Sequence, residues 1–298
     1  WERFVGALHF MATYRFQSLN FFQGKLIPSN QLPWYYLPVW IAITTPVMYS
    51  VAFSMGLISI AKNFLKAGRK VWLNDQGLQD IIFVGLSVVP VFAVMILRSV
   101  LYDGWRHMYF IYPAFVITVS GMIVAWHFLR HHQLLRLAVA LSFCVYMIGV
   151  AYWMFLAHPL QNVYFNILAG KNWHQQYDVD YWGLANRNIL EEIAKRDNQR
   201  LIRVWAGSSN PLPNSLSILS PQIRKRFIVV SQMEESDYII TNYRSNITDY
   251  SSQINSLFLE KKVRDESIVK VYKRNNAPPF PGQDVVRNSL KIGDQLTF

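Results

Sequence analysis

The side chains most able to do chemistry lie in one short stretch, Tyr102-Asp103-Gly104-Trp105-Arg106-His107, between two long apolar segments. An arginine presents a planar fork of N–H donors that matches a phosphate group. His107 could add a hydrogen bond or a proton, and Asp103 could hold the Arg106 guanidinium in place. The stretch therefore predicts a phosphate-binding site made by Arg106, His107 and Asp103. The alternative is a plain connecting loop in which Asp103 pairs with Arg106 and Gly104 makes the turn.

A second group of candidates is aromatic. Trp34 and Tyr35 open the first long apolar segment, where aromatic side chains are typical of a membrane–water boundary. The same rings would also suit a stacking surface for a sugar or a wall for a lipid chain. We therefore expect Trp34 and Tyr35, together with Tyr102, to line a groove for a donor molecule or a lipid.

Two further carboxylates, Asp178 and Asp180, share a face if their segment is extended, but two carboxylates alone make a weak metal site. The chain has no glycine-rich phosphate loop, no Gly-x-Ser-x-Gly and no His-Glu-x-x-His. A soluble nucleotide-dependent enzyme or a metalloprotease therefore has no support. We predict no cofactor and no metal ligands in this chain, and leave open a divalent metal that assists the reaction.

Charge is distributed unevenly along the 298 residues, which carry a formal net charge of +11. The basic residues of the first half cluster in short loops beside apolar segments, as membrane topology requires. Nucleic-acid binding would need a basic face on a soluble fold, so we expect no nucleic-acid partner. The single cysteine excludes a disulfide within the chain. Before residue 158 the acidic residues are only Glu2, Asp75, Asp80 and Asp103.

The apolar segments predict an α-helical integral membrane bundle in residues 33–157. About 20 apolar residues in a helix cross the roughly 30 Å of bilayer hydrocarbon. Before the bundle, residues 1–32 are expected to form an interfacial helix, over residues 4–16, and an outer loop. Four transmembrane helices are expected, near residues 37–61, 81–97, 108–128 and 137–157.

Orientation follows from the basic loops. Lys62, Lys66, Arg69 and Lys70 follow the first expected span, and Arg130 and Arg136 follow the third. The positive-inside rule places both loops in the cytoplasm. The chain is therefore predicted to be a multi-pass protein of the cell inner (plasma) membrane, surrounded by bilayer lipid. The loop 98–107 and everything after the last span would then be periplasmic or otherwise extracytoplasmic.

Residues 158–298 have the composition of a small α/β soluble domain. No apolar segment there reaches membrane length, and residues 187–197 have Ile189, Leu190 and Ile193 at helical spacing. Short strands are predicted around them, at Leu201–Trp205, Arg226–Val230, Tyr238–Thr241 and Ile268–Tyr272.

Three sets of motifs, in this order, resemble a known family. They are Pro33-Trp34-Tyr35-Tyr36 with Ile43-Thr44-Thr45-Pro46, then Tyr102 to His107, then His158-Pro159 with Tyr164-Phe165-Asn166 and Asp180-Tyr181-Trp182-Gly183. Over roughly residues 20–190 the chain resembles the C-terminal portion of bacterial membrane glycosyltransferases of the GT-C superfamily. These are related to the dolichyl-phosphate-mannose–protein mannosyltransferases.

The resemblance implies a hexosyltransferase-like enzyme of the cell envelope. It would take a sugar from a polyprenyl-phosphate-linked donor and transfer it, on the outer face, to a lipid, glycan or protein acceptor. In such enzymes a carboxylate activates the acceptor hydroxyl as a general base, from an outer loop near the N-terminus of the full protein. That loop is not in this sequence, and Asp103 is not its equivalent. We therefore predict no catalytic residue in this chain and no activity from it alone.

A non-enzymatic reading stays open beside the transferase. Several spans followed by an outer α/β domain also suit a membrane sensor or an assembly scaffold whose outer domain binds a partner. An acidic residue in an outer loop shortly after a first span of the full protein would favour the transferase. A transporter is disfavoured, because the spans hold almost no polar residues to line a path.

Overall fold

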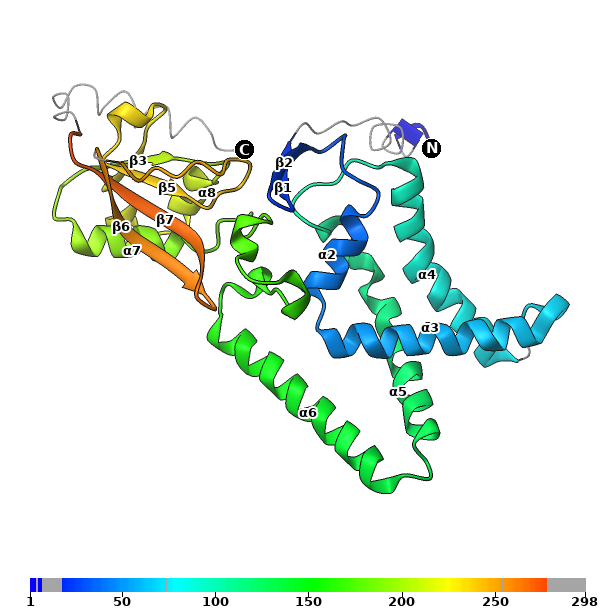
Figure 1. Ribbon diagram of the computed structural model, residues 1–298. Coiled ribbons are helices and arrows are strands. Elements are labelled where there is room, and N and C mark those ends of the chain that lie inside the picture. The colour runs from blue at the N-terminus through cyan, green and yellow to red at the C-terminus, as the bar shows by residue number, and fades with distance from the viewer. Residues whose placement is uncertain (4, 7–17, 73, 253, 278–298) are drawn as a thin grey trace.

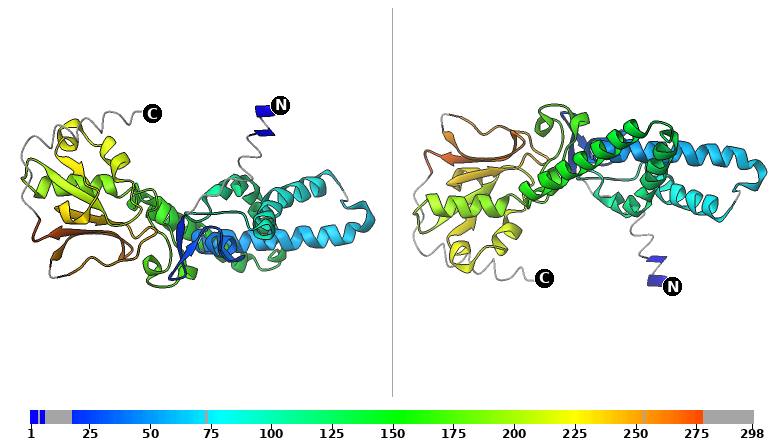
Figure 2. Two further views of the ribbon diagram at one scale, coloured as in Figure 1. Left: turned by 90° about the horizontal axis from the view of Figure 1, so that it is seen from above. Right: turned by 90° about the horizontal axis from the view of Figure 1, so that it is seen from below.

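The computed structural model describes residues 1–3, 5–6, 18–72, 74–252 and 254–277. The interfacial helix expected over residues 4–16 lies outside the described residues, apart from its first few positions, as does the tail after residue 277. The described chain is elongated (Figures 1 and 2), with long helices at one end and a mixed sheet at the other.

The first described elements form a small hairpin on the helical part. Strands β1 (Leu19–Phe22) and β2 (Lys25–Pro28) are antiparallel, with Phe22 opposite Lys25. Gln23 and Gly24 at the turn have φ angles of 50° and 75°. Two central residues with positive φ match the twist of the flanking strands. The hairpin places Asn20 and Phe21 in the interior, next to residues far along the chain.

The first expected span is divided by a proline. Helix α2 covers Tyr36–Thr44 and helix α3 covers Val47–Ala67, with Pro46 between them. Proline has no N–H to continue the helical ladder, so the chain breaks rather than bends. The next helix, α4 (Asp75–Leu97), begins earlier than expected because the Asn74 side chain accepts a hydrogen bond from the Gly77 amide at 2.9 Å.

The prediction of four transmembrane helices is wrong. Residues Arg106–Val116 form a 3₁₀ helix, η2, and only Ile117–Phe128 form the α-helix α5. Twelve α-helical residues span about 18 Å, and Pro113 within η2 removes a backbone donor. Helix α6 (Gln133–Leu156) is longer. Among the described residues, three helices are long and apolar enough to cross a membrane, namely α3, α4 and α6.

Two glycines let α3 and α5 approach closely. A side-chain carbon on Gly121 would overlap the carbonyl of Ala52, and one on Gly56 would overlap the carbonyl of Ile117. Small residues at a crossing are how apolar helices gain close backbone packing. The crossing packs the short α5 against the N-terminal half of α3, and the two helices cross in Figure 1.

The C-terminal domain confirms the expected α/β class. Its five-stranded sheet has the order β4-β3-β5-β7-β6. Strands β3 (Ile202–Ala206), β4 (Phe227–Val229) and β5 (Tyr238–Thr241) are parallel to one another. Strands β6 (Asn255–Val263) and β7 (Glu266–Arg274) form an antiparallel hairpin at the other edge.

Short helices connect the strands of this domain. Helix α7 (Asn186–Arg196) buries Ile189, Leu190 and Ile193, as its spacing predicts. Helices α8 (Leu212–Ser217) and α9 (Pro221–Arg224) follow β3. Short 3₁₀ turns, η3 (Gln161–Val163), η4 (Ile167–Ala169) and η5 (Trp173–Gln175), link α6 to this domain.

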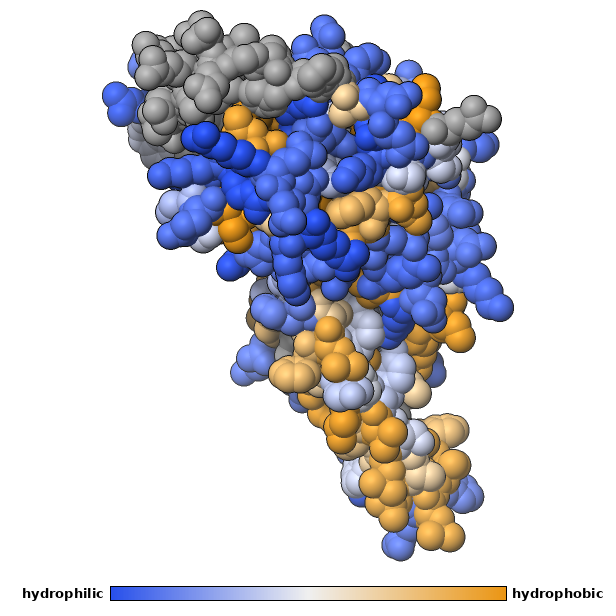
Figure 3. All heavy atoms as spheres, turned by 90° about the vertical axis from the view of Figure 1, so that its left-hand side faces the viewer, coloured by the Kyte–Doolittle hydropathy of each residue, from blue (hydrophilic) through white to orange (hydrophobic). Residues whose placement is uncertain are grey.

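Hydropathy separates the two ends of the molecule. Figure 3 shows hydrophilic residues over the wide α/β end and hydrophobic residues gathered on the narrow part below it. Helix α6 has no buried residue, so its aliphatic side chains face outward. An outward apolar surface on long helices is what a bilayer requires, and it agrees with a membrane protein.

Candidate functional site

The predicted site residues fall into two places. Asp103, Arg106, His107 and Tyr102 lie where the helical part meets the α/β domain. Trp34 lines a separate pocket at the end of α4. Tyr35 packs edge-on against Trp34, with ring centroids 5.7 Å apart. The single groove expected from sequence is thus two neighbouring features.

Asp103 is the centre of the first feature. Its side chain is buried, and its carboxylate accepts two hydrogen bonds from Arg244, at 2.7 Å from Nε and 2.9 Å from Nη2. Arg106 Nη2 lies 3.1 Å from the same carboxylate. Arg244 follows β5 in the α/β domain, so Asp103 connects the two parts of the protein. We call this region, formed by residues 101–106, 178–181 and 242–245, the junction.

The turn that carries Asp103 is held from the N-terminal hairpin. Asp103 and Gly104 have φ angles of 55° and 73°, a left-handed conformation that usually requires support. The Asn20 side chain accepts from the Asp103 amide at 3.2 Å, and the Tyr36 hydroxyl accepts from the Gly104 amide at 3.1 Å. A side-chain carbon on Gly104 would lie 3.4 Å from the Trp40 ring. The position of the Asp103 carboxylate is therefore fixed.

Arg106 and His107 lie on the aromatic side of the same turn. The Arg106 guanidinium stacks over the Tyr102 ring, 4.7 Å from its centroid. The His107 ring meets Tyr102 edge-on at 4.5 Å. Burial and the neighbouring Arg106 charge lower the pKa of His107, so the ring is neutral near pH 7. Arg106 keeps a quarter of its side-chain surface exposed, and that surface remains able to meet an anion.

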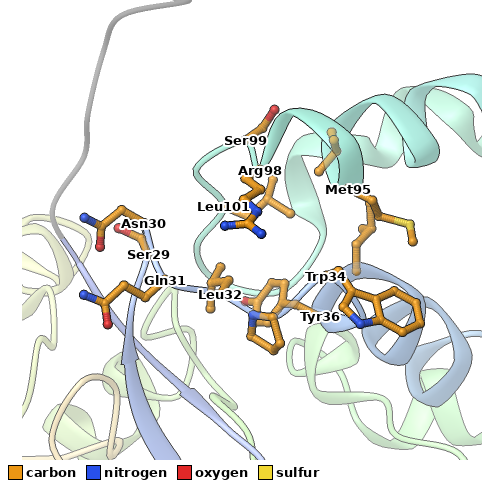
Figure 4. A pocket seen from close by; sticks show the side chains of 13 residues that line it. Ser29, Asn30, Gln31, Leu32, Trp34, Tyr36, Met95, Arg98, Ser99 and Leu101 are labelled. Carbon is orange, nitrogen blue, oxygen red and sulfur yellow. The ribbon is translucent and has the colours of Figure 1, made fainter.

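The second feature is a pocket of about 310 Å³ at the end of α4, which we call the Arg98 pocket. Figure 4 shows the Arg98 side chain reaching from this helix end towards Leu32 and Tyr36, with Trp34 and Met95 across the space. Arg98 is exposed, and within the described residues it makes no ion pair and no side-chain hydrogen bond. Its own backbone is the left-handed cap of α4, with φ 48°. A guanidinium without an ion-pair partner, in a pocket that a tryptophan also lines at the end of an apolar helix, suits an anionic headgroup.

Asp178 is the unexpected member of the junction. One carboxylate oxygen, Oδ2, accepts from the Phe21 amide at 2.8 Å. The other oxygen is buried without a hydrogen-bond partner of good geometry among the described residues. Burial raises the pKa of Asp178 to about 7, with a further rise from Asp103; the amides of Phe21 and Ser245 and the Arg244 charge oppose it. Asp180, two residues on, instead accepts from the Leu184 and Ala185 amides at 2.9 and 2.8 Å.

Sequence reasoning missed three of these residues. Arg98 lies in the expected outer loop, but nothing in its neighbours distinguishes it from a residue that only sets topology. Arg244 and Asn20 are 141 and 83 residues from Asp103, and no local pattern connects them. Among the described residues, no group of three or more His, Cys, Asp or Glu side chains is placed to hold a metal ion.

Comparison with known proteins adds no relative. No family model matches the chain, and neither a curated protein nor a solved structure matches it at a significant level.

Proposed function

We propose that this protein is a membrane glycosyltransferase that takes a sugar from a polyprenyl-phosphate-linked donor and passes it to a lipid, glycan or protein acceptor on the outer face. One observation carries the proposal: the unpaired Arg98 guanidinium in a pocket of about 310 Å³ at the end of a membrane-length helix. A lipid phosphate lies at this depth of a bilayer, with its chain among apolar helices.

The Arg98 pocket supports this function better than the Arg106 cluster does alone. Arg106 shares Asp103 with Arg244, so part of its charge is already matched. Arg98 has no such partner, and Trp34, which lines the same pocket, gives a lipid chain or a sugar an apolar face. In this proposal Arg98 receives the donor phosphate, and Arg106 of the junction, with His107 beside it, supplies a second positive group on the same side of the molecule.

The test supplies labelled polyprenyl-phosphate sugars to membranes that contain the full-length protein. We expect incorporation with at least one donor. Arg98→Ala removes a charge-assisted contact worth about 1.5–3 kcal/mol, which lowers incorporation about ten- to hundredfold. Arg106→Ala is expected to lower it too. Arg187→Ala, on the exposed face of α7, is the matched control and should leave incorporation unchanged.

Three outcomes would count against the proposal in different ways. No incorporation with any of several donors contradicts the transferase. Wild-type incorporation in Arg98→Ala with loss in Arg106→Ala moves the phosphate to Arg106. Wild-type incorporation in both variants removes both arginines from the site.

A further inference from the structure

A small aromatic cavity lies beside the junction, apart from the Arg98 pocket. Its volume is about 120 Å³, and it is lined by side chains of α2, η2 and the segments 161–165 and 178–181. Liquid water occupies about 30 Å³ per molecule, so the cavity holds a few waters or one small polar group. Its wall is formed mainly by the rings of Trp40, Trp105, Tyr109, Tyr112, Phe165 and Tyr181.

Three residues that line this cavity each have a buried polar atom that makes no hydrogen bond of good geometry among the described residues, although the Trp40 indole lies near the Tyr36 hydroxyl and the Asp178 carboxylate lies near the Ser245 amide. These atoms are the indole Nε1 of Trp40, the Oδ1 of Asn162 and the Oδ1 of Asp178. Buried polar atoms nearly always make hydrogen bonds, so three that make none of good geometry around one cavity need an explanation. One is a donor and two are acceptors, and a single small ligand could satisfy all three.

The cavity has a carboxylate, that of Asp178, but no cationic side chain lines it among the described residues. Asp178 forms no ion pair among the described residues. Arg244, whose charge acts on Asp178, forms its ion pair with Asp103, and Arg106 pairs with the same carboxylate. A buried carboxylate without a counter-ion is costly, and a cation supplied by a ligand removes that cost. The cavity therefore lacks a positive charge and has two oxygen acceptors ready for it.

The rings select the kind of cation. Trp105 meets Tyr109 edge-on and tilts against Tyr112, with both centroid separations 5.1 Å. Ring faces attract ammonium groups, whereas Ca²⁺ and Mg²⁺ require six or more oxygen ligands. Of the three buried polar atoms, only Trp40 Nε1 is a donor, so the same ligand needs an oxygen to accept from it.

We propose that this aromatic cavity binds a primary ammonium group that carries a neighbouring oxygen, with the ammonium on Asp178 and Asn162 and the oxygen on the Trp40 indole. Such a group occurs in free amino alcohols and in ethanolamine lipid headgroups. The proposal does not depend on sugar transfer, since it concerns binding alone.

The experiment titrates ethanolamine and its neutral counterpart ethylene glycol into the full-length protein in phosphatidylglycerol nanodiscs at pH 8, followed by calorimetry. We expect ethanolamine to bind at least tenfold more tightly. Asp178→Asn keeps the acceptor for Phe21 but removes the charge, and should lower ethanolamine affinity at least tenfold. Glu191→Gln, which removes a charge on exposed α7, is the control and should change nothing.

A second variant tests the oxygen contact without depending on Asp178. Trp40→Phe keeps a ring but removes Nε1, so it should weaken ethanolamine and leave ethylamine unchanged. Equal binding of ethanolamine and ethylene glycol overturns the proposal. Unchanged ethanolamine affinity in an Asp178→Asn protein that is folded, as shown by a cooperative thermal unfolding transition no lower than that of the wild type, also overturns it.

A further titration distinguishes the two sources of the amine, a lipid headgroup and a water-soluble amino alcohol. If nanodiscs containing phosphatidylethanolamine abolish ethanolamine binding, the lipid headgroup is the occupant. If they leave it unchanged, a water-soluble amino alcohol is the occupant. Either result supports an ammonium site, because both require the cavity to select the charged group.

Discussion

The α/β domain and the junction handle buried charge in opposite ways. In the sheet, Arg203 on β3 binds Asp237 before β5 through Nε at 3.1 Å, Nη2 at 2.6 Å and its own amide at 2.7 Å. Both side chains are more than nine-tenths buried, and both carboxylate oxygens accept. At the junction, Asp178 is as deeply buried, but only one of its oxygens accepts a hydrogen bond of good geometry among the described residues.

The difference separates structural groups from candidate functional ones. A buried ion pair with every hydrogen bond made is explained by the fold that surrounds it. A buried carboxylate that leaves an oxygen unpaired raises the free energy of the folded state, and folding alone gives no reason to keep it. The junction is therefore a better candidate for a functional site than the sheet is.

The largest effect should come from breaking the satisfied pair. Asp237→Ala removes the carboxylate that neutralises the buried Arg203 guanidinium, which should lower the free energy of unfolding by about 3–5 kcal/mol. Thermal unfolding of the purified protein in nanodiscs measures the loss. A loss below about 1 kcal/mol would show that this pair is not structural and would remove the basis of the comparison.

The second effect is a pH dependence that belongs to Asp178. Its folded pKa of about 7 lies above the usual 3.8, so folding takes up a proton between these values. Stability is then highest at low pH and falls by about 1.4 kcal/mol per pH unit as pH rises towards 7. Asp178→Asn should remove this slope and unfold at a higher temperature than wild type at pH 8.

The measurement is the difference between wild type and Asp178→Asn from pH 5 to pH 8, because other groups cancel in the difference. Parallel curves for the two proteins would mean that Asp178 does not hold its proton in the folded state. The junction would then be no different from the sheet.

The sequence predicted the sheet better than the junction, for a physical reason. Alternating and apolar segments mark strands locally, so Tyr238–Thr241 coincides with β5 and the 187–197 helix differs from α7 by one residue at each end. The membrane half was predicted less well. Pro113 and the aromatic residues after Arg106 give an apolar segment of spanning length that folds as a 3₁₀ helix and a short α-helix.

The junction could not be predicted, because its contacts join distant segments. The Asp103–Arg106 pair follows from a spacing of three residues, and the structure contains it. The contacts of Asp103 with Arg244, and of Asp178 with Phe21, cross 141 and 157 residues. Only the folded chain shows that Asp178 and Asp180 have different partners, although they are two positions apart.

That pair of neighbours supplies the third prediction. Asp180 caps the start of the α7 region through two amides, so Asp180→Asn replaces one acceptor with a donor against a buried N–H. We expect unfolding to become easier by about 1–3 kcal/mol, at pH 8 as well as at pH 5. A stabilised Asp180→Asn protein would place Asp180 with Asp178 among the unsatisfied groups.

The smallest effect should come from a charge pair that neither region buries. Arg187 and Glu191 lie one helical turn apart on α7, 3.0 Å from Nε to Oε1, with 59% and 37% of their side-chain surfaces exposed. Solvent screens such a pair, so Glu191→Ala should change the free energy of unfolding by only about 0.3–0.5 kcal/mol. Chemical denaturation at low and high salt measures the change, and the difference should shrink in salt. If Glu191→Ala lowered the free energy of unfolding as much as Asp237→Ala does, burial would not decide the strength of ion pairs in this protein. Burial could then not explain the difference between the sheet and the junction.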